Sequence, residues 1–92
     1  MKTYPKNLLY KALLAAKDEQ ECKSFIRDLC TPQEIKSFEE RLLVAYLLEE
    51  KITYRKISET TGSSTATITR VAQWLNNGEG GYKIILQRLK NK

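Results

Sequence analysis

The sequence predicts an all-α chain of six helices, and three observations support that fold class. Apolar residues recur at helical spacing along most of the 92 residues, and no segment competes as a β-strand. The length suits one domain, residues 1–92, and is too short for two independent hydrophobic cores. The segment from about residue 53 to residue 77 has the pattern of a helix-turn-helix, two helices separated by a sharp turn that contains glycine.

Two short helices are predicted in the first third of the chain. Residues 8–16 form an amphipathic helix with five apolar residues on one face: Leu8, Leu9, Ala12, Leu13 and Ala16. The next helix contains Phe25, Ile26 and Leu29 and ends near Cys30.

The third predicted helix begins at a strong start signal and is apolar over much of its circumference. Thr31 can cap it, Pro32 suits its first turn, and Glu34 completes a capping box. The helix extends to about Glu50. Its apolar residues are Ile35, Phe38, Leu42, Ala45 and Tyr46 on one side, widened by Leu43, Val44, Leu47 and Leu48. We expect it to bury two faces, one of them against another subunit, and burial at the centre of a monomer is the alternative.

Apolar spacing also predicts how the two helices of the helix-turn-helix cross. Ile57 lies five residues before Gly62, while Ile68 and Val71 lie six and nine residues after it. These three side chains can therefore meet where the helices cross. Gly62 can take a positive φ at the bend without steric cost.

The second helix of the motif has the composition of a DNA-reading helix. Either Ser63 or Ser64 can cap its start. Its exposed face would present four short side chains: Thr65, Ala66, Thr67 and Thr69. Their methyl groups can touch thymine, and their hydroxyls can bond base edges or phosphates in the major groove. An ordinary helical hairpin is the alternative, although a face built only for solubility would more often carry Glu and Lys.

A short helix from Tyr82 to about Leu89 is predicted to end the chain. Its apolar residues are Ile84, Ile85, Leu86 and Leu89. The helix is too short to be stable alone, so it must dock on another part of the fold. We expect the glycine-rich segment before it, Asn76 to Gly81, to be a mobile joint.

Charge is distributed unevenly along the chain. The total is +5, with a pI near 9.3. Residues 1–17 carry a net +4, residues 18–52 a net −4, and residues 53–92 a net +5. The helix-turn-helix therefore lies in a basic segment, as binding to phosphates requires.

Several functional classes are disfavoured. The chain has no histidine and no glycine-rich phosphate loop, so we expect neither an enzyme nor a metal site. Cys22 and Cys30 lack the spacing of a zinc site, and buried free thiols are favoured over a disulfide. No apolar run has the length of a membrane span or the form of a signal-peptide core. We expect a cytoplasmic, nucleoid-associated protein without membrane contact.

Several motifs together resemble those of a known family. Three features are similar to the Trp repressor superfamily. They are Thr31-Pro32 at the start of a long central helix, Arg41 inside that helix, and the string Ala66-Thr67-Ile68-Thr69-Arg70. The ending WLNNGEGGYKIILQRL resembles its TrpR-related YerC/YecD branch, and the resemblance spans about Leu8 to Leu89. It implies a bacterial, six-helix, Trp-repressor-like fold in an intertwined homodimer. Two helix-turn-helix units would bind a palindromic operator and repress transcription.

Eight residues are expected to contact double-stranded DNA: Arg55, Lys56, Ser64, Thr65, Ala66, Thr67, Thr69 and Arg70. By resemblance, Arg55 matches a family arginine that approaches a guanine, and Ala66, Thr67 and Thr69 match reading-helix contacts. Lys56 adds attraction to phosphates of any sequence. Thr65 stands where the family has isoleucine, and Tyr54 and Ser58 also depart from the family pattern. We therefore expect a different operator sequence.

An effector pocket is also implied by the resemblance, at Thr31, Arg41, Arg70, Val71 and Trp74. Arg41 and Arg70 match two arginines that flank the bound tryptophan in Trp repressor. Val71 and Trp74 replace a glycine and a serine, and this added volume argues against tryptophan as corepressor, so no cofactor is expected. We hypothesise that Trp74 fills the cavity from within. The alternatives are a core position for Trp74 and surface or interface ion pairs for both arginines.

Taken together, these patterns predict a homodimeric, sequence-specific DNA-binding regulator, a repressor by resemblance. A helical module that uses the same hairpin to bind a protein partner is the alternative. A DNA affinity that depends strongly on salt would favour the regulator.

Overall fold

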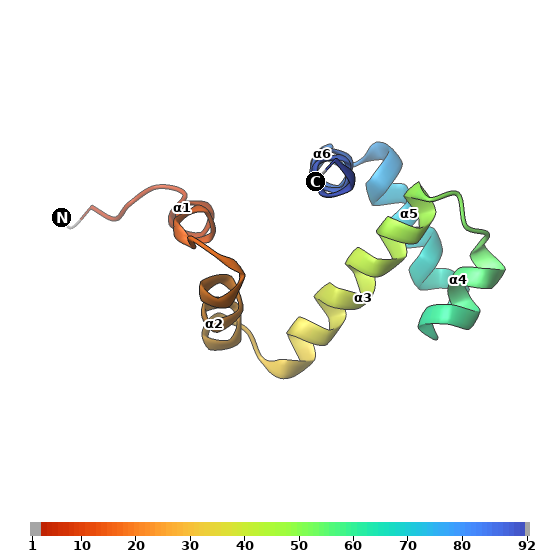
Figure 1. Cartoon of the computed structure of the whole chain (residues 1–92), viewed down its shortest axis with the longest axis horizontal. Helices are drawn as coiled ribbons and strands as arrows, with labels where there is room; N and C mark the ends of the chain where they lie inside the picture. Colours follow the sequence, from red (N-terminus) through yellow and green to blue (C-terminus); the bar gives the residue numbers. More distant parts are fainter. Residues whose placement is uncertain (1–2, 92) are drawn as a thin grey trace. The chain divides into compact units, whose positions relative to one another are not determined.

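The computed structural model describes residues 3–91, which form six α-helices and no strand (Figure 1). The helices are α1 (Leu8–Ala15), α2 (Glu19–Leu29), α3 (Pro32–Glu49), α4 (Tyr54–Thr61), α5 (Thr65–Asn77) and α6 (Gly81–Lys90). The all-α, six-helix prediction is confirmed. The chain divides into two units, residues 1–35 and residues 36–92. Within the described range, no helix combines the length and the apolar character that crossing a membrane requires.

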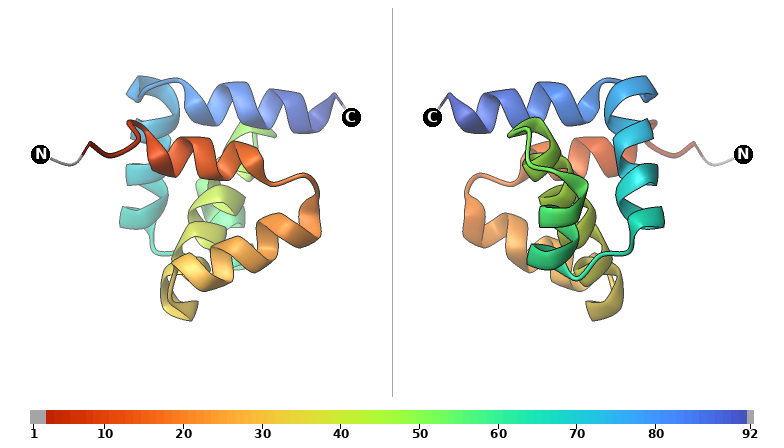
Figure 2. Two further views of the ribbon diagram at one scale, coloured as in Figure 1. Left: turned by 90° about the vertical axis from the view of Figure 1, so that its left-hand side faces the viewer. Right: turned by 90° about the vertical axis from the view of Figure 1, so that its right-hand side faces the viewer.

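The N-terminal unit contains α1, α2 and the start of α3. In it, α1 and α2 run in roughly opposite directions (Figure 2). The Asp18 carboxylate caps α2 by accepting from the Glu21 N–H at 2.8 Å, a start signal that the sequence reading missed. The capping box of α3 is confirmed, because the Glu34 N–H donates to Thr31 Oγ1 at 3.1 Å and the Thr31 N–H donates to Glu34 Oε1 at 2.8 Å.

Neither α1 nor α2 contains a buried residue. Leu8, Leu9 and Leu13, three members of the predicted apolar face, are exposed. Leu14, outside that face, is 85% exposed. This hairpin of helices therefore has no enclosed core of its own.

The cysteines are free, but the expectation that both thiols are buried is wrong. Cys22 is exposed near the start of α2, and Cys30 is half-buried at the C-cap of that helix. At the helical rise per residue, their Cα atoms lie about 12 Å apart, beyond the roughly 7 Å that a disulfide can span. The two thiols cannot bond to each other while α2 is folded.

The hydrophobic core lies in the C-terminal unit and draws on four helices. Its buried residues are Val44 and Ala45 of α3, Ile57 of α4, Ile68, Val71 and Leu75 of α5, and Leu86 of α6. Leu47, Leu48, Ile52 and Tyr82 pack half-buried against them. α5 packs against both α4 and α6 and so occupies the centre of this unit (Figure 1).

One apolar surface of α3 is covered and another is open. Val44 and Ala45 are fully buried in the core. Four large side chains of the same helix are 39–47% exposed: Phe38, Leu42, Leu43 and Tyr46. The sequence reading grouped Ala45 with Phe38 and Leu42, whereas the core takes Ala45 with its neighbour Val44. The chain itself therefore covers only part of the apolar surface of α3.

The predicted docking of the last helix is confirmed. Leu86 is 1% exposed in the core. Lys83 Nζ lies 4.0 Å from Glu49 Oε1, and Lys90 pairs with Glu50. The hydrogen bond to Glu50 raises the pKa of Lys90 above its ordinary value. These ion pairs join α6 to the C-terminal end of α3.

The connection between α5 and α6 is shorter than the sequence suggested. Asn76 and Asn77 belong to α5, so only Gly78, Glu79 and Gly80 connect the two helices. The Gly78 N–H caps α5 by donating to the Trp74 carbonyl at 2.9 Å. A Cβ at Gly78 would collide with that carbonyl oxygen. Glycine at this position therefore serves a close approach of backbone to backbone.

Candidate nucleic-acid interface

The turn between α4 and α5 is held by hydrogen bonds from both sides. Gly62 has a φ of 76°, as expected at the bend, and its N–H donates to the Ser58 carbonyl at 2.8 Å. The Ser58 hydroxyl donates to the Ser63 carbonyl at 2.9 Å. Thr61 Oγ1 donates to the Ile57 carbonyl at 2.8 Å and accepts from the Ser63 N–H at 3.1 Å. The sequence reading missed these bonding roles of Ser58 and Thr61.

Behind the turn, the predicted crossing of α4 and α5 is present. Ile57, Ile68 and Val71 are each fully buried. Burial of one such side chain stabilises a fold by about 1.5–3 kcal/mol. The two helices are therefore packed by this chain alone.

Ser64, not Ser63, caps α5. The Ser64 hydroxyl accepts from the Thr67 N–H at 3.1 Å and lies 3.1 Å from Thr67 Oγ1. Ser63 is 3% exposed, and its Oγ has no hydrogen-bond partner among the described residues. The sequence could not separate these adjacent serines, because the choice depends on which one the core covers.

Most of the expected reading face of α5 is open. Thr65, Ala66 and Thr69 are exposed, as is Arg70, while Thr67 is half-buried. These side chains are short, so a partner could approach the helix backbone closely.

Basic groups accompany this face. Arg55 and Lys56, in the first turn of α4, are exposed, and the Arg55 side chain is 90% exposed. Glu59 lies one turn further along α4, and its Oε2 is 3.7 Å from Arg55 Nε. Glu59 is the only acidic residue between positions 53 and 78, and the sequence reading gave it no role.

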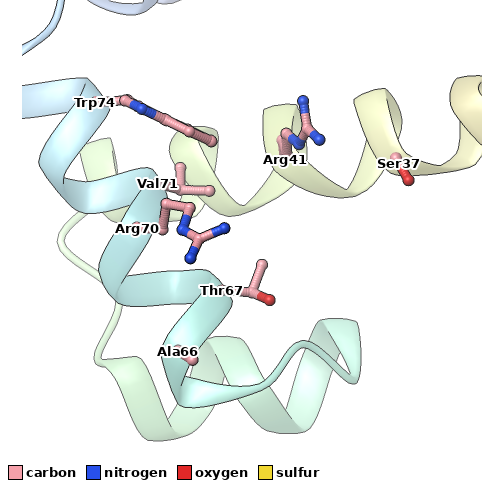
Figure 3. Close-up of a pocket in the computed structure, with 7 residues that line it drawn as sticks. All are labelled: Ser37, Arg41, Ala66, Thr67, Arg70, Val71 and Trp74. Carbon is pink, nitrogen blue, oxygen red and sulfur yellow. The ribbon is translucent and has the colours of Figure 1, made fainter.

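A pocket lies between α3 and α5, close to the reading face (Figure 3). Its volume is about 280 Å³, and its lining residues are Ser37, Arg41, Ala66, Thr67, Arg70, Val71 and Trp74. In Figure 3, Arg70 and Thr67 project from α5 toward the side on which α3 lies. Trp74 is 42% exposed and forms part of the wall, so in this structure it neither fills the cavity, as hypothesised, nor lies in the core. The pocket thus brings together four of the five residues expected there. It adds Ser37, which had no expected role, and Ala66 and Thr67, which were expected to contact DNA.

Arg41 lies within cation–π distance of two aromatic rings. Its guanidinium carbon lies 5.7 Å from the centroid of the Trp74 ring and 5.8 Å from that of the Phe38 ring. Within the described residues, neither Arg41 nor Arg70 forms an ion pair. Thr31, the fifth expected residue, belongs to the N-terminal unit, where its hydroxyl caps α3.

Comparison with known proteins agrees with this geometry. A family model described as "Trp repressor protein" matches residues 6–90. The uncharacterized protein YerC of Bacillus subtilis (strain 168) is 49% identical over 82 residues, which are 89% of this chain and 79% of YerC.

Two solved structures are also similar. A TrpR-like protein from Eubacterium eligens ATCC 27750 has a TM-score of 0.88 and 45% identity, and the match covers 97% of this chain and 92% of that one. A candidate Trp repressor from Staphylococcus aureus has a TM-score of 0.86 and 40% identity, with coverage of 94% and 86%. The resemblance drawn from the sequence motifs is confirmed, and the chain belongs to the Trp repressor family, a family of DNA-binding regulators.

Proposed function

We propose that this protein is a sequence-specific DNA-binding transcriptional regulator, a repressor, that reads the major groove with α5. The exposed, short side chains at the start of α5, packed on a fully buried helix crossing, carry this proposal. In it, Ala66, Thr67 and Thr69 contact base edges and Arg55 contacts a guanine. The rest of the contact surface consists of Lys56, Ser64, Thr65 and Arg70. Of these, the cations Lys56 and Arg70 contact phosphates.

The proposal includes a homodimer in which residues 1–92 act as one domain completed by a second copy. Two observations support it: α1 and α2 bury no residue, and α3 leaves a large apolar surface open. Monomeric soluble proteins rarely expose contiguous apolar surface of this kind. A two-fold dimer would carry two α5 helices, which would read the two halves of a palindromic operator.

DNA binding without tryptophan is also part of the proposal. By family resemblance, Arg41 is an arginine that faces a bound tryptophan, and in this chain its guanidinium carbon already lies 5.7 Å from the centroid of the Trp74 ring. This contact joins α3 to α5 and would keep the reading helix in one orientation. A pre-organised helix removes the population cost that a ligand otherwise offsets.

Selection of bound sequences from a random DNA pool tests the proposal, with and without added tryptophan. We expect enrichment of a two-fold symmetric site under both conditions. Enrichment only with tryptophan would contradict the ligand-free part of the proposal. No enrichment under either condition would overturn the regulator and favour the alternative, a hairpin that binds a protein partner.

Substitution of Trp74 tests the same part directly. Trp74→Ala should weaken DNA binding and make it respond to tryptophan, whereas Trp74→Phe, which keeps an aromatic ring for Arg41, should behave like wild type. Unchanged binding by Trp74→Ala, with no response to tryptophan, would show that Trp74 is only a packing residue.

A further inference from the structure

Glu59 is a charge of the wrong sign for a surface that binds phosphates. It is the only acidic residue between positions 53 and 78, and its side chain is 57% exposed. It stands on α4 one turn after Arg55, with 3.7 Å between Glu59 Oε2 and Arg55 Nε. Near a DNA backbone, an uncompensated carboxylate opposes binding to every sequence equally.

The Glu59 carboxylate contributes little to the stability of the fold. Exposed i,i+4 ion pairs contribute little to stability, and the Arg55 side chain is 90% exposed. α4 is stabilised in other ways: Thr53 Oγ1 accepts from the Lys56 N–H at 3.2 Å, and Ile57 is fully buried. Glu59, which lies beside an arginine expected to contact a base, can therefore have a role in DNA binding.

The geometry of the pair suits selective reading. Glu59 approaches Arg55 at Nε, which leaves both terminal nitrogens of the guanidinium free. Those two nitrogens form the fork that can donate to O6 and N7 of one guanine. A phosphate that takes the same fork also brings its negative charge toward Glu59. The carboxylate therefore disfavours phosphate contacts of Arg55 more than its contact with an uncharged base edge.

We propose that Glu59 is a positioning residue that directs Arg55 to a guanine and suppresses its binding to phosphates of unrelated DNA. This inference rests on the proposed DNA-binding function. Glu59 thereby sets the ratio between specific and non-specific affinity, while binding no base itself.

The Glu59→Gln variant tests the role, with the full chain titrated against the selected duplex and a scrambled duplex at several salt concentrations. Binding of the scrambled duplex should tighten about tenfold, with a salt slope steeper by about one unit, the value for one added phosphate contact. Binding of the selected duplex should change less than about twofold, since the base contact of Arg55 remains. The specificity ratio then falls about tenfold. Equal tightening on both duplexes, or no change on either, would overturn the inference.

Two further variants identify the cause. Glu79→Gln removes the same charge from the link after α5 and should leave the specificity ratio unchanged. In an Arg55→Ala background, Glu59→Gln should no longer alter the ratio, because Glu59 acts through Arg55. If the ratio still falls in that background, Glu59 acts independently of Arg55.

The wild-type protein separates this inference from the proposed function. If wild type does not distinguish the selected duplex from the scrambled one, both fail. If wild type discriminates and Glu59→Gln discriminates equally well, only the role of Glu59 is wrong.

Discussion

The helix-turn-helix and the N-terminal hairpin differ in how much apolar surface each covers by itself. In α4 and α5, Ile57, Ile68 and Val71 are fully buried, whereas α1 and α2 bury no residue. The helix-turn-helix is thus packed by its own unit, while the N-terminal hairpin has apolar side chains and no core. The contrast indicates that one chain suffices to shape the surface proposed to face DNA, and that burial of the apolar side chains of the hairpin requires further contacts.

The largest expected effect is in the core of the helix-turn-helix. Ile57→Ala should lower the free energy of unfolding by about 2–5 kcal/mol, because it leaves a cavity at the helix crossing. The measurement is urea denaturation. Leu14→Ala is the matched control at an 85% exposed site, and at concentrations where the chain is monomeric it should cost less than about 0.5 kcal/mol. Equal losses of stability in the two variants would contradict the difference in packing between the helix-turn-helix and the N-terminal hairpin.

The next effect concerns the open apolar surface of α3. Leu42→Glu should weaken self-association at least about tenfold, or about 1.4 kcal/mol, since it would bury an unpaired charge between subunits. Sedimentation equilibrium gives the dissociation constant. Thr60→Glu, which adds the same charge at an exposed site on α4, should leave association unchanged. A wild-type chain that stays monomeric at millimolar concentration would contradict the proposed dimer.

A smaller pair of opposite effects is expected within the turn of the helix-turn-helix. Ser64→Ala removes the cap of α5 and should cost about 0.5–2 kcal/mol. Ser63→Ala removes a buried hydroxyl that has no partner among the described residues, so stability should stay equal or rise by up to about 1 kcal/mol. Thermal melts of the two variants compare them directly. A loss for Ser63→Ala as large as that for Ser64→Ala would indicate that the Ser63 hydroxyl is bonded in solution.

The smallest effect is the alkaline dependence of α6 docking. The hydrogen bond to Glu50 raises the pKa of Lys90 in the folded state. A raised pKa of a cation contributes stability that is complete below the unfolded pKa and is lost as pH rises through the folded pKa. Melting temperatures between about pH 8 and pH 12 should therefore fall less steeply in Lys90→Gln than in wild type. Arg88→Gln, which leaves the Lys90–Glu50 pair intact, should retain the wild-type decline.

Features set by neighbouring residues were predictable from the sequence. The Thr31–Glu34 capping box and the positive φ at Gly62 depend on a few residues and on backbone geometry. The crossing of Ile57 with Ile68 follows from helical period alone. The exposure of Thr65, Ala66 and Thr69 on α5 was predictable for the same reason.

Features set by distant contacts were not predictable. Which side of α3 enters the core depends on where α5 and α6 pack, so Val44 was not singled out. Ser37 lines the pocket only because the fold brings this part of α3 near α5. The exposure of Cys22 reflects a hairpin without a core, which the helical periodicity of its residues does not reveal.

Contacts described above connect α3, α5 and α6 into a closed triangle. Arg41 joins α3 to α5 through Trp74, the link after Gly78 joins α5 to α6, and Lys83 and Lys90 join α6 back to α3. The connection between α6 and α3 combines the buried Leu86 with these two exposed ion pairs, and salt screens the ion pairs. In a test of the proposed DNA binding, added salt would therefore weaken these ion pairs as well as the attraction to phosphates. The measured dependence of DNA affinity on salt then includes a contribution from the ion pairs between α6 and α3. That contribution cancels only when two variants that both keep these ion pairs are compared.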